Sequence, residues 1–355
     1  MKTPTTLDCA KLMSRLDEMV EGKCAIALTQ VDPDALASAF AMRLLLRSRS
    51  DKDIPIFYAG SVAHPQNRCV VNRYDLLSYI RPFPTERADE YTVVLVDSSK
   101  AEDGRCPTLV QMQIAVVVDH HRGCDIRDDQ AFVWVEEVGA CSTLMAEILY
   151  AAKEAGDSKE GDAIQEIPRE IRVMLALGIY TDTKALISAS KRDREAYAWL
   201  TEDLDHADMS QFIEYPLPDT HFQNLNYALS HMTRDKDRIV ATCGVIETSE
   251  SDDLSTIADY MLRMSGVTLV VVWAIVGGKV RVSARNRDLT TPLDQFLKDR
   301  LGSKSGAKLS PDGRGEGGAM LDLDLGLWLC EDTLPAIEQM VKLRLESLIF
   351  TRVKN

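Results

Sequence analysis

This sequence has few of the features that mark membrane-spanning or secreted proteins. Its longest apolar stretch, VTLVVVWAIVGG at 267–278, is too short to cross a bilayer as a helix. The opening residues, MKTPTTLDCAKLM, contain no apolar run of the kind that a secretory signal needs. The eight cysteines include no Cys-x-x-Cys pair. We therefore expect a cytoplasmic protein with reduced thiols and no membrane partner.

Basic residues are also in short supply, with 41 Lys and Arg against 55 Asp and Glu and a formal charge of −14. An acidic surface of this kind repels duplex nucleic acid and argues against a long groove that follows its phosphates. We therefore expect no duplex nucleic-acid partner. A short anionic substrate, held by cations and a few arginines, remains compatible with this charge.

What is present is an alternation of short apolar strands and longer helical patterns. We expect strands at 24–29, 55–60, 92–97, 114–119 and 131–136. We expect helices at 7–21, 35–48, 142–156, 168–181 and 190–204. This alternation predicts an α/β fold with a mostly parallel sheet that is covered on both faces.

The pattern is interrupted near 205–220, where HADMSQFIEYPLPDT contains two prolines. At 355 residues the chain can hold two domains, and we place them at 1–210 and 220–355. The second domain is expected to be a smaller α/β unit with strands at 238–245, 267–276 and 279–286, and helices at 219–232, 251–265, 291–301 and 332–350. A cleft between the domains is the expected ligand site.

Carboxylates and imidazoles stand at the ends of several apolar runs or in the turns after them. They are Asp32 and Asp34 in VDPDA, Asp97 in TVVLVDSS, the triplet Asp119-His120-His121 after IAVVV, and Asp182 in GIYTDT. Open α/β sheets bind ligands at the carboxyl ends of their strands. Mixed Asp and His ligands suit divalent cations, so the sequence predicts a metal site there.

Each of these residues also has a structural interpretation. Asp32 and Asp34 suit helix N-caps, Asp182 suits a helix end, and one of the paired histidines could be a core residue. A cap needs one carboxylate, whereas two ions explain the pair Asp32 and Asp34 better. Cys124 follows three residues after His121, but a soft thiolate fits poorly in a carboxylate-rich site.

Taken in order, these segments resemble the motifs of the DHH phosphoesterase superfamily. VDPDALASA at 31–39, VLVDSS at 94–99, VVDHH at 117–121 and GIYTDT at 178–183 resemble its four motifs. VRVSARNR at 280–287 and GRGEGGAML at 313–321 resemble the substrate-binding elements of the associated DHHA1 domain. The size and the two-part plan are most similar to the nanoRNase and pAp-phosphatase branch.

The resemblance implies a pair of Mn²⁺ ions, with Mg²⁺ or Co²⁺ as alternatives, that activate a water for attack on phosphorus. One ion would be held by Asp32 and Asp97, and the other by Asp34, Asp97, His120 and Asp182. Asp119 would orient a histidine, and His121 would contact the scissile phosphate and protonate the leaving oxygen. The substrate's far end would contact Arg285, Arg287, Gly313, Gly315, Gly317 and Gly318.

The sequence departs from the family's pattern in two places. The family carries a histidine four residues before the first motif's first aspartate, and here that position is Leu28. The glycine loop that begins at Gly313 also lacks the histidine that follows it in the family. An apolar side chain cannot coordinate a cation, so we expect the ion at Asp32 to bind weakly.

The resemblance implies a hydrolase of very short oligoribonucleotides or of a 3′-phosphorylated nucleotide such as pAp. A polyphosphate or cyclic-dinucleotide hydrolase is an alternative on the same scaffold. A second alternative, which Leu28 supports, is a degenerate member that binds nucleotides without hydrolysing them. A duplex-DNA exonuclease is disfavoured by the acidic charge. Whether the chain forms a homodimer is left open.

Overall fold

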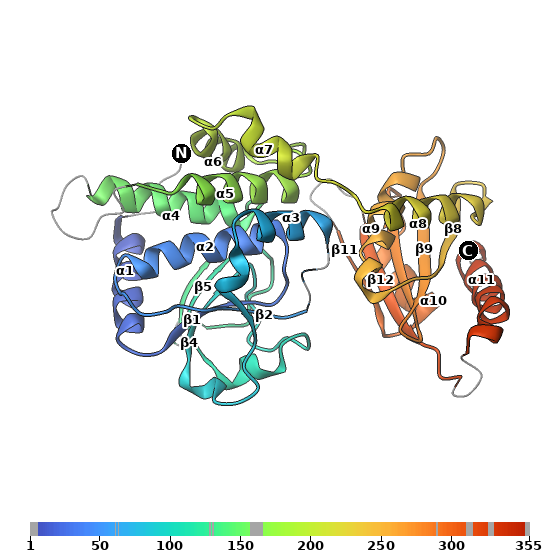
Figure 1. Cartoon of the computed structure of the whole chain (residues 1–355), viewed down its shortest axis with the longest axis horizontal. Coiled ribbons are helices and arrows are strands. Elements are labelled where there is room, and N and C mark those ends of the chain that lie inside the picture. Colours follow the sequence, from blue (N-terminus) through green and yellow to red (C-terminus); the bar gives the residue numbers. More distant parts are fainter. Residues whose placement is uncertain are drawn as a thin grey trace. The chain divides into compact units, whose positions relative to one another are not determined.

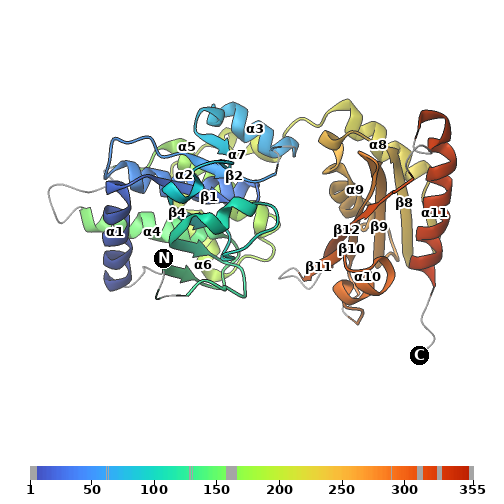
Figure 2. The same cartoon turned by 90° about the horizontal axis from the view of Figure 1, so that it is seen from below.

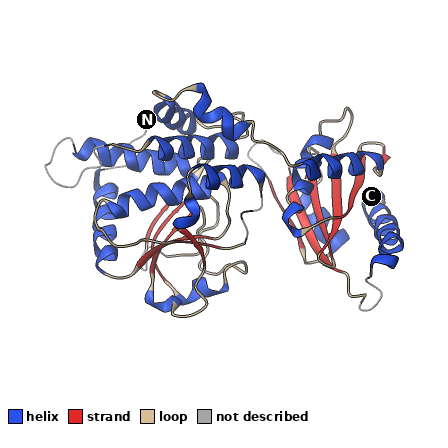
Figure 3. Ribbon diagram, viewed as in Figure 1, coloured by secondary structure: helices blue, strands red, loops and turns tan. Residues whose placement is uncertain are grey.

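The computed structural model describes residues 6–351, apart from 61, 63, 128, 130, 157–165, 289, 310–314 and 326–329. The chain divides into two compact units, Met1–Tyr215 and Pro216–Asn355 (Figure 1). Each unit is built on its own six-stranded sheet, and the strands are drawn in red in Figure 3. None of the described helices combines the length and the apolar character needed to cross a membrane.

The first unit contains an all-parallel sheet. Its strands are β1 (Cys24–Leu28), β2 (Ile56–Tyr58), β3 (Ile80–Pro82), β4 (Thr92–Val96), β5 (Gln113–Asp119) and β6 (Phe132–Val135). Their order is β3-β2-β1-β4-β5-β6. Strands β2 and β3 therefore lie on one side of β1, and β4, β5 and β6 lie on the other. In open α/β sheets this reversal of direction marks the ligand-binding position at the carboxyl ends of the strands. Here it lies between β1 and β4.

Helices cover one face of this sheet, as Figure 1 shows for α1, α2, α4 and α5. The helices of the unit are α1 (Thr6–Glu21), α2 (Pro33–Arg47), α3 (Pro65–Arg73), α4 (Cys141–Gly156), α5 (Arg169–Asp182), α6 (Lys191–Thr201) and α7 (His206–Ile213). Strand β1 divides its apolar side chains by alternation. Ile26 and Leu28 join the core on the helical side, whereas Ala25 and Ala27 join the smaller core on the other face.

The second unit has a mixed sheet in which, among the described residues, only β8 and β9 pair in parallel. Its strands are β7 (Thr233–Asp235), β8 (Arg238–Val245), β9 (Leu269–Val276), β10 (Lys279–Asn286), β11 (Ser305–Leu309) and β12 (Gly315–Asp322). Its helices are α8 (Asp219–Ser230), α9 (Asp253–Met261), α10 (Leu293–Leu301) and α11 (Leu334–Phe350). Helices α8 and α9 pack on one face of the sheet, and α10 and α11 pack on the other, where Figure 2 shows α11 alongside the strands.

The predicted α/β class is confirmed, together with the strands and helices that had strong apolar patterns. Helix α7 was not predicted, since its segment was interpreted as part of the linker. The short edge strands β3 and β7 were also missed, because their sequences, IRP and TRD, offer no apolar run.

The predicted glycine loop is wrong for Gly315, Gly317 and Gly318, which lie in strand β12 between β10 and β11. A Cβ at Gly317 would lie 2.5 Å from Ala307 Cβ, and one at Gly318 would lie 2.4 Å from the Val282 carbonyl oxygen. These glycines therefore permit close approach of neighbouring strands. Gly313 lies outside the described residues.

Candidate metal centre

Asp34, in the first turn of α2, is fully buried and points at the N-terminus of α4. Its two carboxylate oxygens accept hydrogen bonds from the backbone N–H groups of Cys141 and Ser142, each at 2.7 Å. The positive end of the helix dipole and two amides thus hold this carboxylate in place. Gly178 makes room for it, because a Cβ there would lie 3.0 Å from an Asp34 oxygen and 2.3 Å from Ser142 Oγ.

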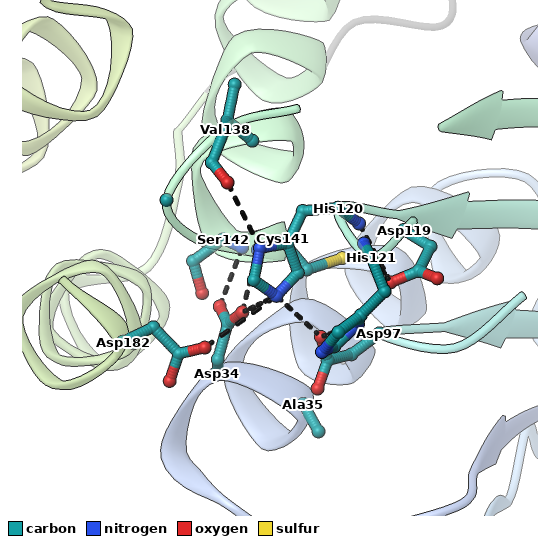
Figure 4. A network of polar contacts seen from close by, with 12 residues as sticks. Asp34, Ala35, Asp97, Asp119, His120, His121, Val138, Cys141, Ser142 and Asp182 are labelled. Carbon is teal, nitrogen blue, oxygen red and sulfur yellow. Dashed lines mark hydrogen bonds and ion pairs between the residues drawn. The ribbon is translucent and has the colours of Figure 1, made fainter. Parts of the chain in front are cut away.

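The imidazole of His120, which follows β5, lies at the centre of the site (Figure 4). Its Nδ1 lies 3.2 Å from the carbonyl oxygen of Val138, and since a carbonyl can only accept, Nδ1 carries the proton. Its Nε2 faces three carboxylates, at 3.3 Å from Asp97, 3.7 Å from Asp182 and 3.8 Å from Asp34. Carboxylates from three separate elements thus converge on one nitrogen.

This arrangement fits a divalent cation. His120 Nε2 and Asp97 Oδ1 are both buried, and neither has a hydrogen-bond partner among the described residues. Since Nδ1 is protonated, the Nε2 lone pair that faces the negatively charged oxygens is available either to a proton or to a metal cation. A histidine that ligates a metal commonly donates its other N–H to a backbone carbonyl, as His120 does. Ligand atoms lie close enough to share an ion in two overlapping groups, one of Asp34, His120 and Asp182 and the other of Asp97, His120 and His121. Because the Nε2 of His120 faces Asp34, Asp97 and Asp182, an ion at this nitrogen would be held by these four residues.

The raised pKa values of these groups also show that the cluster favours bound positive charge. Burial and the neighbouring charge of Asp97 raise the pKa of Asp34 to about 6. Burial and the charges of Asp34, Asp32 and Asp97 raise the pKa of Asp182 well above its usual range. For His120, burial acts to lower the pKa, but Asp97, 3.3 Å from Nε2, and the other surrounding carboxylates raise it to about 10. Without a metal, the cluster therefore retains protons.

Asp97, just after β4, adopts a left-handed backbone conformation with φ of 54°. Aspartate tolerates this conformation better than most residues, although it remains unfavourable. Its backbone N–H donates to the Val118 carbonyl, which continues the pairing of β4 with β5. The bend brings Oδ1 to 3.3 Å from His120 Nε2 and 3.7 Å from His121 Nδ1. Strain of this kind is typical of functional sites.

Asp119 and His121 form a hydrogen-bonded pair beside this cluster. The Nδ1 of His121 donates to Asp119 Oδ1 at 2.8 Å, and the same oxygen accepts the backbone N–H groups of His120 and His121. This bond raises the pKa of His121. For Asp119, burial acts to raise the pKa, but the bonds from His121 and Ser99 lower it. Asp119 is fully buried, whereas the His121 side chain is 47% exposed, so the ring reaches solvent.

Asp32 has a different environment from the other predicted ligands. It is the N-cap of α2, where Oδ1 accepts the backbone N–H of Ala35 at 2.9 Å. Its Oδ2 accepts a bond from the Gln30 side-chain amide at 3.4 Å. Among the described residues, the groups close enough to share one ion include neither Asp32 nor Cys124.

Of the two arginines of the second unit that were predicted to contact the substrate, one is mostly buried and the other is exposed. Arg285, on β10, forms an ion pair with Asp259 at 2.9 Å and is mostly buried. Arg287 follows the strand and is exposed. Their contacts with a substrate remain predictions.

Asp193, a buried carboxylate that the sequence analysis missed, holds the loop next to His120. Asp193 accepts bonds from the backbone N–H of Gly139 at 2.9 Å, from Thr143 Oγ1 at 2.7 Å and from the backbone N–H of Ser190 at 2.6 Å. It thereby holds the 136–140 loop, whose Val138 carbonyl orients His120. The capping box Ser190-x-x-Asp193 is visible in the sequence, but it signals only the start of α6.

Part of this chain is similar to a known family. Residues 24–179 match the DHH family, N-terminal domain. An uncharacterized protein of Methanocaldococcus jannaschii is 29% identical over 298 residues, which are 83% of this chain but only 58% of that protein.

Two solved structures share the fold. An exopolyphosphatase-related protein of Bacteroides fragilis matches over 99% of this chain and 100% of its own, with a TM-score of 0.69 and 14% identity. RecJ of Thermus thermophilus in complex with Mn²⁺ matches over 96% of this chain and 55% of its own, with a TM-score of 0.52 and 14% identity.

Proposed function

We propose that this chain is a member of the DHH phosphoesterase superfamily and that it hydrolyses a phosphoester bond with the help of a divalent cation. The observation that carries the proposal is the position of His120 Nε2, which faces three carboxylates while Val138 fixes the tautomer. A divalent cation at this position supplies a nucleophilic water at neutral pH and neutralises charge on the phosphoryl oxygens.

His121 and Asp119 serve the proton transfer in this proposal. The bond from His121 Nδ1 to Asp119 leaves Nε2 as the nitrogen available to a substrate. The hydrogen bond to Asp119 raises the pKa of His121 and so favours the protonated ring, which is the form that donates a proton to a leaving oxygen. Asp119, fully buried and accepting three bonds, keeps the ring in this orientation.

For the substrate, we propose a very short oligoribonucleotide or a 3′-phosphorylated nucleotide such as pAp, with Mn²⁺ as the cation. The formal charge of −14 supports a small anion over a duplex. Polyphosphate and cyclic dinucleotides require the same phosphoryl chemistry and stay in the test as alternatives.

The proposal is tested by turnover of pAp, a diribonucleotide, polyphosphate and a cyclic dinucleotide, each with Mn²⁺ and with chelator. We expect hydrolysis of at least one nucleotide with Mn²⁺ and loss of that activity with chelator. The Asp97→Asn variant controls for contaminating hydrolases, because it keeps the side-chain shape and removes the ligand charge. Equal turnover by wild type and Asp97→Asn would refute a role for this site.

A second candidate function is nucleotide binding without hydrolysis. Leu28, at the position of the family's histidine ligand, is fully buried in the apolar core, and Asp32 acts as a helix cap. The second ion, predicted at Asp32 and Asp97, therefore has few ligands here. Equilibrium binding of pAp in the presence of Mn²⁺, with no product after long incubation, would favour this candidate.

A further inference from the structure

The side chain of Arg105 lies beside the predicted position of the second ion, the one expected at Asp32 and Asp97. Its Nη1 donates to Gln30 Oε1 at 2.8 Å, and its Nη2 donates to Thr29 Oγ1 at 3.3 Å. Both partners directly follow strand β1, at the edge of the sheet where Asp32 also lies. Asp103 holds the guanidinium from the other side, with bonds to Nε at 2.9 Å and to Nη2 at 2.6 Å.

Asp32 belongs to the same network. The Gln30 amide bridges the two groups, since its oxygen accepts from Arg105 and its nitrogen donates to Asp32. Hydrogen bonding to Asp103 raises the pKa of Arg105 most, and the charge of Asp32 adds to this rise. The charge of Asp32 also acts on Asp182, so Asp32 lies within electrostatic range of both the guanidinium and the metal cluster.

These residues do not fit a second divalent ion. Position 28 offers a buried leucine in place of an imidazole, and the Gln30 oxygen is engaged by Arg105. Asp32 and Asp97 are the remaining predicted ligands, and among the described residues Asp32 is outside the groups close enough to share one ion. A guanidinium at this place also repels a dication.

We propose that this chain holds a single divalent cation, at Asp34, Asp97, His120 and Asp182, and that Arg105 takes the place of the second by binding a phosphoryl oxygen of the substrate. The inference rests on the proposed function. A guanidinium carries five N–H donors in a fork that matches phosphate. The described bonds use four of them, and the side chain is 51% exposed, so one Nη1 donor can reach a ligand.

The first experiment counts Mn²⁺ ions per chain by calorimetric titration without substrate, in wild type, Leu28→His, Arg105→Gln and the double variant. We expect one ion in wild type and in each single variant, and a second ion only in the double variant. Two ions of similar affinity in wild type would overturn the inference. A second ion in Leu28→His alone would also overturn it, because Arg105 would then not occupy the position.

The second experiment measures the affinity of the Mn²⁺-loaded protein for inorganic phosphate. Arg105→Gln should weaken it roughly 10- to 100-fold, the usual effect of losing a hydrogen bond to a charged group. The matched control is Arg81→Gln, which removes another exposed, carboxylate-paired arginine, on the edge strand β3. Equal affinity in the two variants would overturn the anion-binding role of Arg105.

These outcomes separate the inference from the proposed function. A wild-type protein that binds no Mn²⁺ would remove the proposed function itself. The comparison of phosphate binding between Arg105→Gln and Arg81→Gln would still decide whether Arg105 binds an anion. Turnover measurements enter neither experiment.

Discussion

At the scale of single residues, the choice of the His120 tautomer determines the chemistry of the site. The Val138 carbonyl holds a proton on Nδ1, so that Nε2, which faces the three carboxylates, is the nitrogen that can give up its proton to a metal. In the other neutral tautomer Nε2 would carry the proton and could not coordinate a metal. The Val138 carbonyl therefore orients His120 so that its Nε2 can join the acidic groups as a metal ligand.

Asp97 is the residue whose loss should be most damaging. We expect Asp97→Asn to lower both Mn²⁺ affinity and turnover by more than about a hundredfold, since even partners outside the ligand set contribute up to that much. Asparagine also tolerates the left-handed backbone at φ 54°, whereas alanine adds a strain of roughly 1–2 kcal/mol. Comparing the Asn and Ala variants by melting temperature separates this strain from the loss of the ligand. Near-normal turnover in a folded Asn variant would contradict the assignment.

The raised pKa values of the cluster predict how metal binding depends on pH. Without metal, His120 has a pKa of about 10 and Asp34 of about 6, and that of Asp182 is raised as well. A cation needs these groups deprotonated, so its binding must release protons. We therefore expect Mn²⁺ affinity to fall as the pH falls from 8 to 6, by about tenfold per unit for each proton released. Calorimetry in buffers of different ionisation enthalpy counts the protons, and a flat profile would contradict the prediction.

At the scale of elements, the 136–140 loop connects the carboxyl end of β6 to the N-terminus of α4. Asp193, at the start of α6, binds its Gly139 amide, and Asp34, from α2, binds the first amides of α4. Two buried carboxylates thus hold the loop and the helix end that surround His120. The ligand geometry therefore depends on how α2, α4 and α6 pack against one another.

Gly139 provides a test of this dependence. A Cβ there would lie 2.5 Å from Thr183 Cγ2 and 2.6 Å from Asp193 Oδ2. We expect Gly139→Ala to cost about 1–3 kcal/mol of stability and to weaken Mn²⁺ binding roughly tenfold, by displacing the Val138 carbonyl. Gly22→Ala is the control, because its new Cβ would meet only the Met19 carbonyl oxygen, at 3.9 Å. Unchanged Mn²⁺ affinity in Gly139→Ala would show that the loop does not position His120.

At the scale of the whole molecule, the two units have separate sheets and separate apolar cores. The proposed ligands Asp34, Asp97, His120 and Asp182 all belong to the first unit. Metal binding should therefore stabilise that unit without a direct effect on the second.

Calorimetric unfolding of the full chain can detect this difference. With free Mn²⁺ at a hundred times its dissociation constant, the first unit should gain about 2.7 kcal/mol. For a unit of this size, that gain corresponds to a rise in melting temperature of roughly 5–10 °C. We expect one transition to move with Mn²⁺ and to return with chelator. Asp97→Asn should abolish the shift, and equal movement of both transitions would contradict the placement of the site.

The sequence by itself determined much of the fold and the composition of the candidate site. Apolar runs such as CAIAL and AVVV predict buried parallel strands, because strands buried on both faces bury every successive side chain. Acidic groups after such runs must lie at the same edge of the sheet, since parallel strands end together. The order of apolar runs and polar strand ends is therefore sufficient to group Asp34, Asp97 and His120 at one site.

The tertiary structure alone decided what each of these groups contacts. No local pattern indicates that Asp34 caps α4, more than 100 residues away, or that Arg105 reaches the Gln30 side chain. Nor does local sequence reveal that GEGGAMLD forms a strand, because pairing on both sides overrides the low strand propensity of glycine. The physical reason is the same in each case. Local sequence sets which conformations a segment favours, whereas a hydrogen bond between distant segments depends on how the whole core packs.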